Sequence, residues 1–241
     1  MDRAALDEHD RVEDVHWWFT ARRRIVLDRL SRLVPPAPDR LVVEVGCGTG
    51  ANLAALAARY RVLGIEPDAI AAERARQKSG APVLVGALPE AAGLIPAEAA
   101  AVLCLDVLEH VAEDRAALAA LAARLRPGAA LLVTVPAGPG LFGAHDRALG
   151  HCRRYTRGEL ASKLGAAGFQ VQFISYFNTL LLPPAWLWRR LRGDRGARTD
   201  LALPWAPVNW LLGPIFGFER LLLRLVRLPV GLSLIAEALR A

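Results

Sequence analysis

The feature that most constrains the fold of this chain is a glycine-rich turn between a short apolar run and an alanine-rich segment. The run at 41–45 has the length and composition of a buried strand in a parallel sheet. Gly46, Gly48 and Gly50 follow it, and the segment at 52–59 has helical composition. Because glycine has no side chain, a ligand can approach the backbone of this turn closely. The pattern therefore predicts a strand, a ligand-binding turn and a helix, in that order.

Strand and helix patterns alternate after this turn. We expect further strands at 61–66, 82–85, 101–106 and 129–135, with helices between them at 69–78 and 112–125. Such alternation predicts βαβ units and a mainly parallel sheet with helices on both faces. Outside this region we expect helices at 5–33 and 156–167 and strands at 169–176 and 233–240.

The 241 residues suit one large α/β domain with an insertion. We expect four segments, which are an N-terminal helical segment (1–36), the main ligand-binding domain (37–177), an insertion (178–231) and the final strand of the sheet (232–241). The insertion interrupts the alternation of strands and helices with a stretch rich in Leu, Trp, Pro and Arg.

The amino-acid composition excludes some classes of protein and favours others. A hydrophobic fraction of 54% excludes a disordered chain, and the net charge of +6 favours an anionic partner or reflects a bias toward arginine codons. Cys47, Cys104 and Cys152 are far apart, which indicates a reducing compartment and disfavours disulfides and zinc sites. No apolar run reaches the roughly 18 residues that span a bilayer. We therefore expect a cytoplasmic protein, or one bound peripherally to the inner face of the membrane.

The glycine turn by itself fits two cofactors. Gly46, Gly48 and Ala51 also satisfy the dinucleotide fingerprint. Glu44 precedes the first glycine by two residues, where a carboxylate would repel a pyrophosphate but attract the sulfonium and ammonium of S-adenosyl-L-methionine. Glu66 ends the next strand, and an acid there accepts hydrogen bonds from the ribose of either cofactor.

Four segments in the same order and spacing resemble the class I S-adenosylmethionine-dependent methyltransferases. They are 44–50, Glu66-Pro67-Asp68, Ala87-Leu88-Pro89 and 106–111. The resemblance covers about residues 40–175. It implies a doubly wound, Rossmann-like sheet of seven strands whose last strand is antiparallel.

The resemblance also implies which residues hold the cofactor. Glu44 and the glycine turn would hold the methionine end, Glu66 the ribose and Leu88 the adenine, and Asp106 would face the methionine. Arg22, from the N-terminal segment, could pair with the methionine carboxylate. The full implied set is Arg22, Glu44, Gly46, Gly48, Gly50, Asn52, Glu66, Pro67, Leu88 and Asp106.

Two flanking motifs resemble a subgroup of these enzymes that is often associated with cell-envelope glycan or lipid pathways. The first is His16-Trp17-Trp18-Phe19, and the second runs from Gly143 through His145-Asp146 to His151-x-Arg153-Arg154-Tyr155. Trp17 and Trp18 could close over the cofactor cleft, or they could dock on the core as ordinary helix residues.

Acid–base candidates gather after the fourth and fifth predicted strands. We expect His145 to act as a general base, with His110 as the second candidate. Asp106, Glu109 and His110 resemble an acid-x-x-Glu-His metal motif of ubiquinone-pathway and small-RNA O-methyltransferases, which has Glu at the position of Asp106. The alternative, which we prefer, is that Glu109 only stabilises a helix N-terminus and that no metal is bound.

The composition of the insertion is typical of two roles, which are binding to an anionic partner and covering the active site. Arg220, Arg224 and Arg227 share one face of a predicted helix beside several leucines, as in helices that bind anionic membranes. A cap over the active site explains the same residues, and nucleic acid is a weaker option because no RNA-binding motif occurs. We expect O-methylation of a small or lipid-linked acceptor. The alternatives are a nicotinamide-dependent oxidoreductase and a non-catalytic, membrane-associated nucleotide-binding protein.

Overall fold

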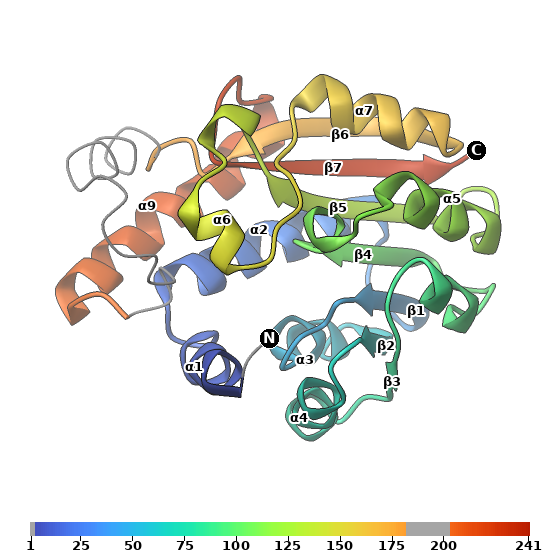
Figure 1. Ribbon diagram of the computed structural model, residues 1–241, viewed down its shortest axis with the longest axis horizontal. Coiled ribbons are helices and arrows are strands. Elements are labelled where there is room, and N and C mark those ends of the chain that lie inside the picture. Colours follow the sequence, from blue (N-terminus) through green and yellow to red (C-terminus); the bar gives the residue numbers. More distant parts are fainter. Residues whose placement is uncertain (1–2, 182–202) are drawn as a thin grey trace.

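The computed structural model describes residues 3–181 and 203–241 and contains a seven-stranded sheet of order β3-β2-β1-β4-β5-β7-β6 (Figure 1). The strands are β1 (Ala37–Val45), β2 (Tyr60–Glu66), β3 (Val83–Val85), β4 (Ala101–Leu105), β5 (Ala130–Pro136), β6 (Phe169–Phe177) and β7 (Ser233–Arg240). β7 pairs antiparallel with both β5 and β6, and the other neighbours pair in parallel. The predicted fold class is confirmed.

Helices cover both faces of the sheet (Figure 1). They are α1 (Arg3–Val12), α2 (Trp17–Leu33), α3 (Ala51–Ala57), α4 (Ala69–Ser79), α5 (Asp114–Arg124), α6 (Ala144–Ala148), α7 (Arg157–Ala166) and α9 (Ala206–Leu225), with short 3-10 turns η1 (Glu90–Leu94), η2 (Leu108–His110) and η3 (Pro139–Leu141). β4 shows the two faces, since Val102 and Cys104 pack in the core under α5 and α7, whereas Leu103 and Leu105 pack in the core under α2, α3 and α9. Each parallel strand is apolar on both sides for this reason.

The strand order reverses at β1, which lies between β2 and β4. In a doubly wound sheet, ligands bind at the carboxyl ends of the strands beside such a reversal. Gly46 follows β1 and Val107 lies just beyond β4, and these two residues approach each other closely. The fold therefore places the glycine turn at the expected ligand-binding edge.

The predicted helix at 5–33 is wrong as a single element. The structure has α1 and α2, separated by a turn at 13–16. His16 adopts an extended backbone conformation and its side chain accepts a hydrogen bond from the backbone N–H of Trp18. This is an N-cap, which begins a new helix because it satisfies one of the first free N–H groups.

The described part of the insertion packs along α2. Asn209 of α9 accepts a hydrogen bond from the backbone N–H of Trp17 (2.9 Å) and donates one to the carbonyl of Val15 (2.9 Å), so α9 begins beside the start of α2. Trp17 packs edge-on against Phe216, with ring centroids 5.8 Å apart. Trp17 is thus a half-buried residue that packs against the core between two helices, which agrees with the docking alternative. Residues 182–202 of the insertion lie outside the described residues.

The expectation that three arginines share one helical face is wrong. α9 ends at Leu225, so Arg227 lies beyond it, where its guanidinium stacks over Phe173 (5.7 Å). Arg224 pairs with Asp28 of α2, which leaves Arg220 on the neighbouring turn. The helix stops because Val226 is extended and Pro229 follows closely. In the ranges described above, no helix has the length and apolar character needed to cross a membrane.

Candidate active site

The three glycines of the turn have different physical roles. All three have positive φ angles, of +71° at Gly46, +56° at Gly48 and +96° at Gly50. A Cβ on Gly46 would lie 2.5 Å from Val107, and a Cβ on Gly50 would lie 2.7 Å from the backbone of Ala75. A Cβ on Gly48 would meet nothing within 4 Å. Gly46 and Gly50 therefore serve the packing, whereas Gly48 leaves open space in which a cofactor can approach the backbone.

Glu66 is fixed at the end of β2 by backbone groups. Its carboxylate accepts hydrogen bonds from the N–H of Gly48 (2.8 Å) and the N–H of Asp68 (3.1 Å). Burial raises the pKa of Glu66, although these two bonds oppose the shift. The side chain is thus held rigidly beside the open glycine, where ribose hydroxyls would reach it. Pro67 stands between Glu66 and Asp68, the N-cap of α4.

Glu44 is a buried carboxylate that is only half satisfied. It is 1% exposed, and one oxygen accepts a hydrogen bond from Asn52 (3.1 Å). The other oxygen has no partner among residues 3–181 and 203–241. Burial raises the pKa of Glu44 to about 8, which means that the carboxyl holds a proton at neutral pH until a cation arrives. A sulfonium or ammonium would be such a cation, so the residue fits the methionine end of S-adenosylmethionine.

Arg22 of α2, which is buried, forms an ion pair with the half-buried Asp106, which directly follows β4. The guanidinium contacts the Asp106 carboxylate at 2.7 Å and donates a hydrogen bond to Thr134 at 2.8 Å. Thr134 in turn donates to Asp106 (2.9 Å), and Trp18 lies against Arg22 at 5.1 Å. Asp106 has a φ of +59°, a conformation that costs free energy in a non-glycine residue and recurs at functional sites. The role of Arg22 at a methionine carboxylate stays a prediction.

Leu88 follows β3 and is 8% exposed. It packs in the same core as Leu63 and Ile65 of β2. An apolar side chain at this position offers a surface for a purine ring, and its contact with adenine stays a prediction.

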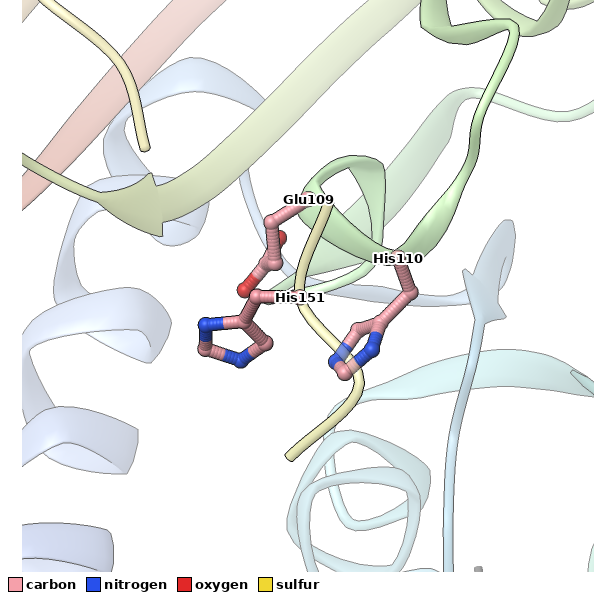
Figure 2. Close-up of side chains that lie close together, drawn as sticks. All are labelled: Glu109, His110 and His151. Atoms are coloured by element: carbon pink, nitrogen blue, oxygen red, sulfur yellow. The ribbon is translucent and has the colours of Figure 1, made fainter. Parts of the chain in front are cut away.

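A second group of polar side chains lies beyond β4 (Figure 2). Ligand atoms of Glu109, His110 and His151 all lie within 4.8 Å of one another. Glu109 is fully buried, and neither of its oxygens has a hydrogen-bond partner within the described ranges. Burial raises the pKa of Glu109 well above its ordinary value, and the nearby Asp106 adds to the shift. A buried carboxylate beside two imidazoles is a donor set that a divalent transition metal accepts.

The segment that carries His151 is held in place by Asp146. The Asp146 carboxylate contacts Nδ1 of His151 (2.9 Å) and Nε of Arg154 (2.8 Å). The N–H of Cys152 also donates to the carbonyl of Glu109 (2.7 Å). A carboxylate on one ring nitrogen fixes the orientation of the other, as is typical of metal-ligating histidines.

The structure brings together a different set of donors from the metal candidates of the sequence. Asp106 lies outside this group, and its carboxylate pairs with Arg22 and accepts a hydrogen bond from Thr134. His151 takes the third position, although it lies 40 or more residues further along the chain. His145 lies on α6, half-buried, next to Asp146 and outside the cluster. Its role as a base stays a prediction.

Glu13 is a site residue that the sequence did not indicate. It follows α1 and accepts a hydrogen bond from Thr49 of the glycine turn (2.6 Å). Burial would raise the pKa of Glu13, but hydrogen bonds from His9, Lys78 and Thr49 lower it to about 2. The contact ties the N-terminal segment to the cofactor turn. Nothing in the local sequence pattern distinguishes Glu13 from the charged residues of α1.

Comparison with known proteins identifies the family of this chain. The model of a methyltransferase-domain family matches residues 18–172. Trans-aconitate 2-methyltransferase of Deinococcus radiodurans is 33% identical over 161 residues, which cover 64% of this chain and 57% of that protein. A ubiquinone biosynthesis O-methyltransferase of Xylella fastidiosa is 32% identical over 134 residues and is covered to 52%. The chain thus spans only about half the length of these two relatives.

Solved structures agree on the fold. The complex of the Haloferax volcanii methyltransferase activator Trm112 with a methyltransferase contains a chain that matches 98% of this one, with a TM-score of 0.62 and 18% identity over 94% of its own length. Geranyl diphosphate C-methyltransferase of Streptomyces coelicolor matches 92% of this chain and 76% of its own, with a TM-score of 0.61 and 15% identity. The family match includes the glycine turn, so the dinucleotide alternative is set aside. The chain therefore belongs to the methyltransferase-domain family and shares the fold of these solved methyltransferase structures.

Proposed function

We propose that this chain transfers the methyl group of S-adenosylmethionine to a hydroxyl oxygen of a small or lipid-linked acceptor. The observation that carries the proposal is the pair of buried carboxylates Glu44 and Glu66, which stand at the ends of adjacent strands beside the open Gly48. One carboxylate has an oxygen free for a cation, and the other is already oriented for ribose hydroxyls.

Methyl transfer from a sulfonium is an in-line displacement in which the acceptor oxygen attacks the methyl carbon and the sulfur leaves as a thioether. Much of the acceleration in such a step comes from holding both partners in line. Glu44, Gly48 and Glu66 would hold the methyl donor. Glu44 would contact the methionine end and Glu66 the ribose, and the open backbone at Gly48 would let the cofactor approach. Arg22 keeps the Asp106 carboxylate in place at the neighbouring strand end.

An acceptor hydroxyl must lose its proton during the transfer. His145 is our candidate for the base that removes it, with His110 second. An O-methyltransferase is also favoured by the relatives, since several carry that activity in their names. These relatives are distant, so the acceptor atom remains part of the proposal.

Glu109, His110 and His151 would hold a divalent ion in the same region. The ion would act as a Lewis acid that lowers the pKa of the acceptor hydroxyl. The unpartnered carboxylate of Glu109 fits this role, because a buried carboxylate without hydrogen bonds costs free energy unless a cation compensates it. One carboxylate and two imidazoles favour a transition metal over Mg²⁺.

Cofactor binding tests the first part of the proposal. Calorimetry with the purified chain should show binding of S-adenosylmethionine and no binding of NADH. Incubation with labelled cofactor and panels of phenols, hydroxy acids and lipid-linked glycans should then release S-adenosylhomocysteine with at least one hydroxyl acceptor. Tight binding of the cofactor without transfer to any acceptor would instead favour the non-catalytic alternative.

Metal titration tests the second part without an acceptor. Mn²⁺ or Zn²⁺ added to chelator-treated protein should bind at one site, and Glu109→Gln and His151→Ala should each abolish it. His9→Ala is the matched control, since His9 lies on α1 away from this cluster. Wild-type binding in the Glu109 variant would remove the metal from the mechanism and leave His145 as the proposed base.

A further inference from the structure

Helix α9 is apolar on two faces, and the described residues of the chain cover only one of them. Leu212, Phe216 and Leu223 pack in the core against α2. The opposite face carries a second row of apolar residues, three or four positions apart, which we call the outer row. It consists of Trp210, Pro214, Phe218, Leu221 and Leu225. Trp210 is 77% exposed and Leu225 is 83% exposed, so this row faces solvent along most of the helix.

A strongly basic hollow lies along the flank of the outer row, between α2 and α9. It has a volume of about 260 Å³ and is lined by Arg24, Leu27, Asp28, Ser31, Arg32, Arg59, Arg220 and Arg224. Among these lining residues, five are arginines and one is a carboxylate, and that carboxylate already pairs with Arg224. The hollow therefore presents excess guanidinium groups, which bind phosphate oxygens in pairs.

The hollow and the outer row are adjacent because of their spacing along the helix. Arg220 and Arg224 directly precede Leu221 and Leu225, so on a helix the two arginines form the strip next to the outer row. Arg24 and Arg32 approach the same hollow from α2. The result is an apolar strip with a basic recess at its side.

This surface is separate from the cofactor site. Arg59 directly precedes β2, so the hollow reaches the edge at which the strands begin, opposite the glycine turn. The start of α9, with the exposed Trp205 just before it and the exposed Trp210 after its first turn, lies instead at the ligand-binding edge, because Asn209 is bonded to residues at the start of α2. α9 thus extends alongside α2 from the active-site edge toward the far edge (Figure 1).

We propose that α9 lies in the surface of an anionic phospholipid membrane, with the outer row in the acyl region and a lipid phosphate in the arginine-lined hollow. An interfacial helix needs an apolar row, basic residues at its flank and tryptophans at the boundary, and this helix has all three. A soluble phosphate compound would use the hollow but would leave the outer row exposed. Nucleic acid would use the arginines but would gain nothing from Phe218 or Leu225. The proposal adds a location to the proposed function and does not depend on the identity of the acceptor.

Vesicle binding tests the proposal with the whole chain. The protein should sediment with vesicles of phosphatidylcholine and phosphatidylglycerol and not with phosphatidylcholine alone. Rising salt should release it, because surface charges are screened within about 8 Å at physiological ionic strength. The double variant Arg24→Glu/Arg220→Glu should lower the partition coefficient by about tenfold or more, since each basic residue near an anionic surface contributes measurably.

Matched variants separate charge from fold. Arg115→Glu/Arg126→Glu makes the same charge change at exposed positions on and just after α5, which covers the opposite face of the sheet, and should bind vesicles like the wild type. Phe218→Ser/Leu225→Ser should also lose vesicle binding although no charge changes. Lipids with bromine on the acyl chain should quench tryptophan fluorescence in the wild type and not in this variant. All variants should keep wild-type calorimetry with S-adenosylmethionine, so failure here is distinguishable from failure of the proposed function.

Three outcomes would overturn the proposal. The first is no binding to anionic vesicles even at low salt. The second is vesicle binding that the two double variants leave unchanged. The third is binding of glycerol phosphate or of double-stranded RNA with the same arginine dependence and without any vesicle binding, which would assign the hollow to a soluble phosphate compound or to nucleic acid.

Discussion

The two halves of the active-site edge are built in different ways. At the ends of β1 and β2, the functional groups lie within a few residues of a strand end, and nearby residues hold them, since backbone N–H groups bind Glu66 and the Asn52 side chain binds Glu44. Beyond β4 and β5, the groups come from segments about 40 residues apart, and the side chain of Asp146, which also binds Arg154, holds His151. The first half is a local structure that suits the cofactor, whichever reaction the cofactor takes part in. The second half depends on tertiary contacts, and in this half an enzyme family can change its acceptor.

Gly48→Val should produce the largest effect, the loss of detectable cofactor binding. The valine side chain would project into the open space in which the cofactor approaches the turn. Gly80→Val is the matched control, because Gly80 also has a positive φ (+67°) and open space around it, so the cost of backbone strain is similar. Calorimetry and thermal melting of both variants would check this. Equal affinity for the cofactor in the two variants would contradict the assignment of the glycine turn as its binding site.

His145→Ala tests the other half of the edge. If His145 is the base, turnover should fall by ~10²–10⁴-fold while the affinity for S-adenosylmethionine hardly changes. Release of S-adenosylhomocysteine with a hydroxyl acceptor measures the first quantity, and calorimetry measures the second. A fully active variant would move the role to His110 or His151, or show that no base is needed.

Glu66→Ala should weaken cofactor binding by roughly 1–3 kcal/mol, because a charged acceptor for the ribose is removed. Glu98→Ala is the control, since that carboxylate is exposed and pairs with Arg61 at the surface. Melting curves should show that both variants are folded. Unchanged affinity in the Glu66 variant would mean that the ribose lies elsewhere.

Glu44→Gln should have the smallest effect, and it should appear in the pH dependence. The pKa of Glu44 is raised to about 8 in the free protein, and a bound cation favours the ionised form and lowers it. Binding should therefore release up to one proton, and affinity should rise as the pH increases toward about 8. Calorimetry between about pH 5 and 7, where the ligand ammonium stays charged, in buffers of different ionisation enthalpy would measure the protons released. The glutamine variant should show none.

The sequence alone determined the sheet and the cofactor turn. Apolar runs of strand length, glycines directly after the first strand and acids at fixed distances are local patterns, and local patterns follow from backbone geometry. The positions of Glu44, Gly48 and Glu66 at one edge of the sheet therefore follow from their spacing along the chain.

Tertiary structure decided what local patterns cannot express. The N-cap at His16 divides the N-terminal helical segment into two helices, and Arg227 lies past the end of α9. The start and the end of a helix depend on one or two residues, so the sequence pattern does not locate them. The possible metal ligands that lie together include His151 and not Asp106. Arg22, more than 80 residues earlier in the chain, pairs with the aspartate, and Asp146 orients the histidine. The two-faced character of α9 was likewise decided by packing, since periodicity shows that a helix is apolar but only its neighbours determine which apolar face stays in solvent.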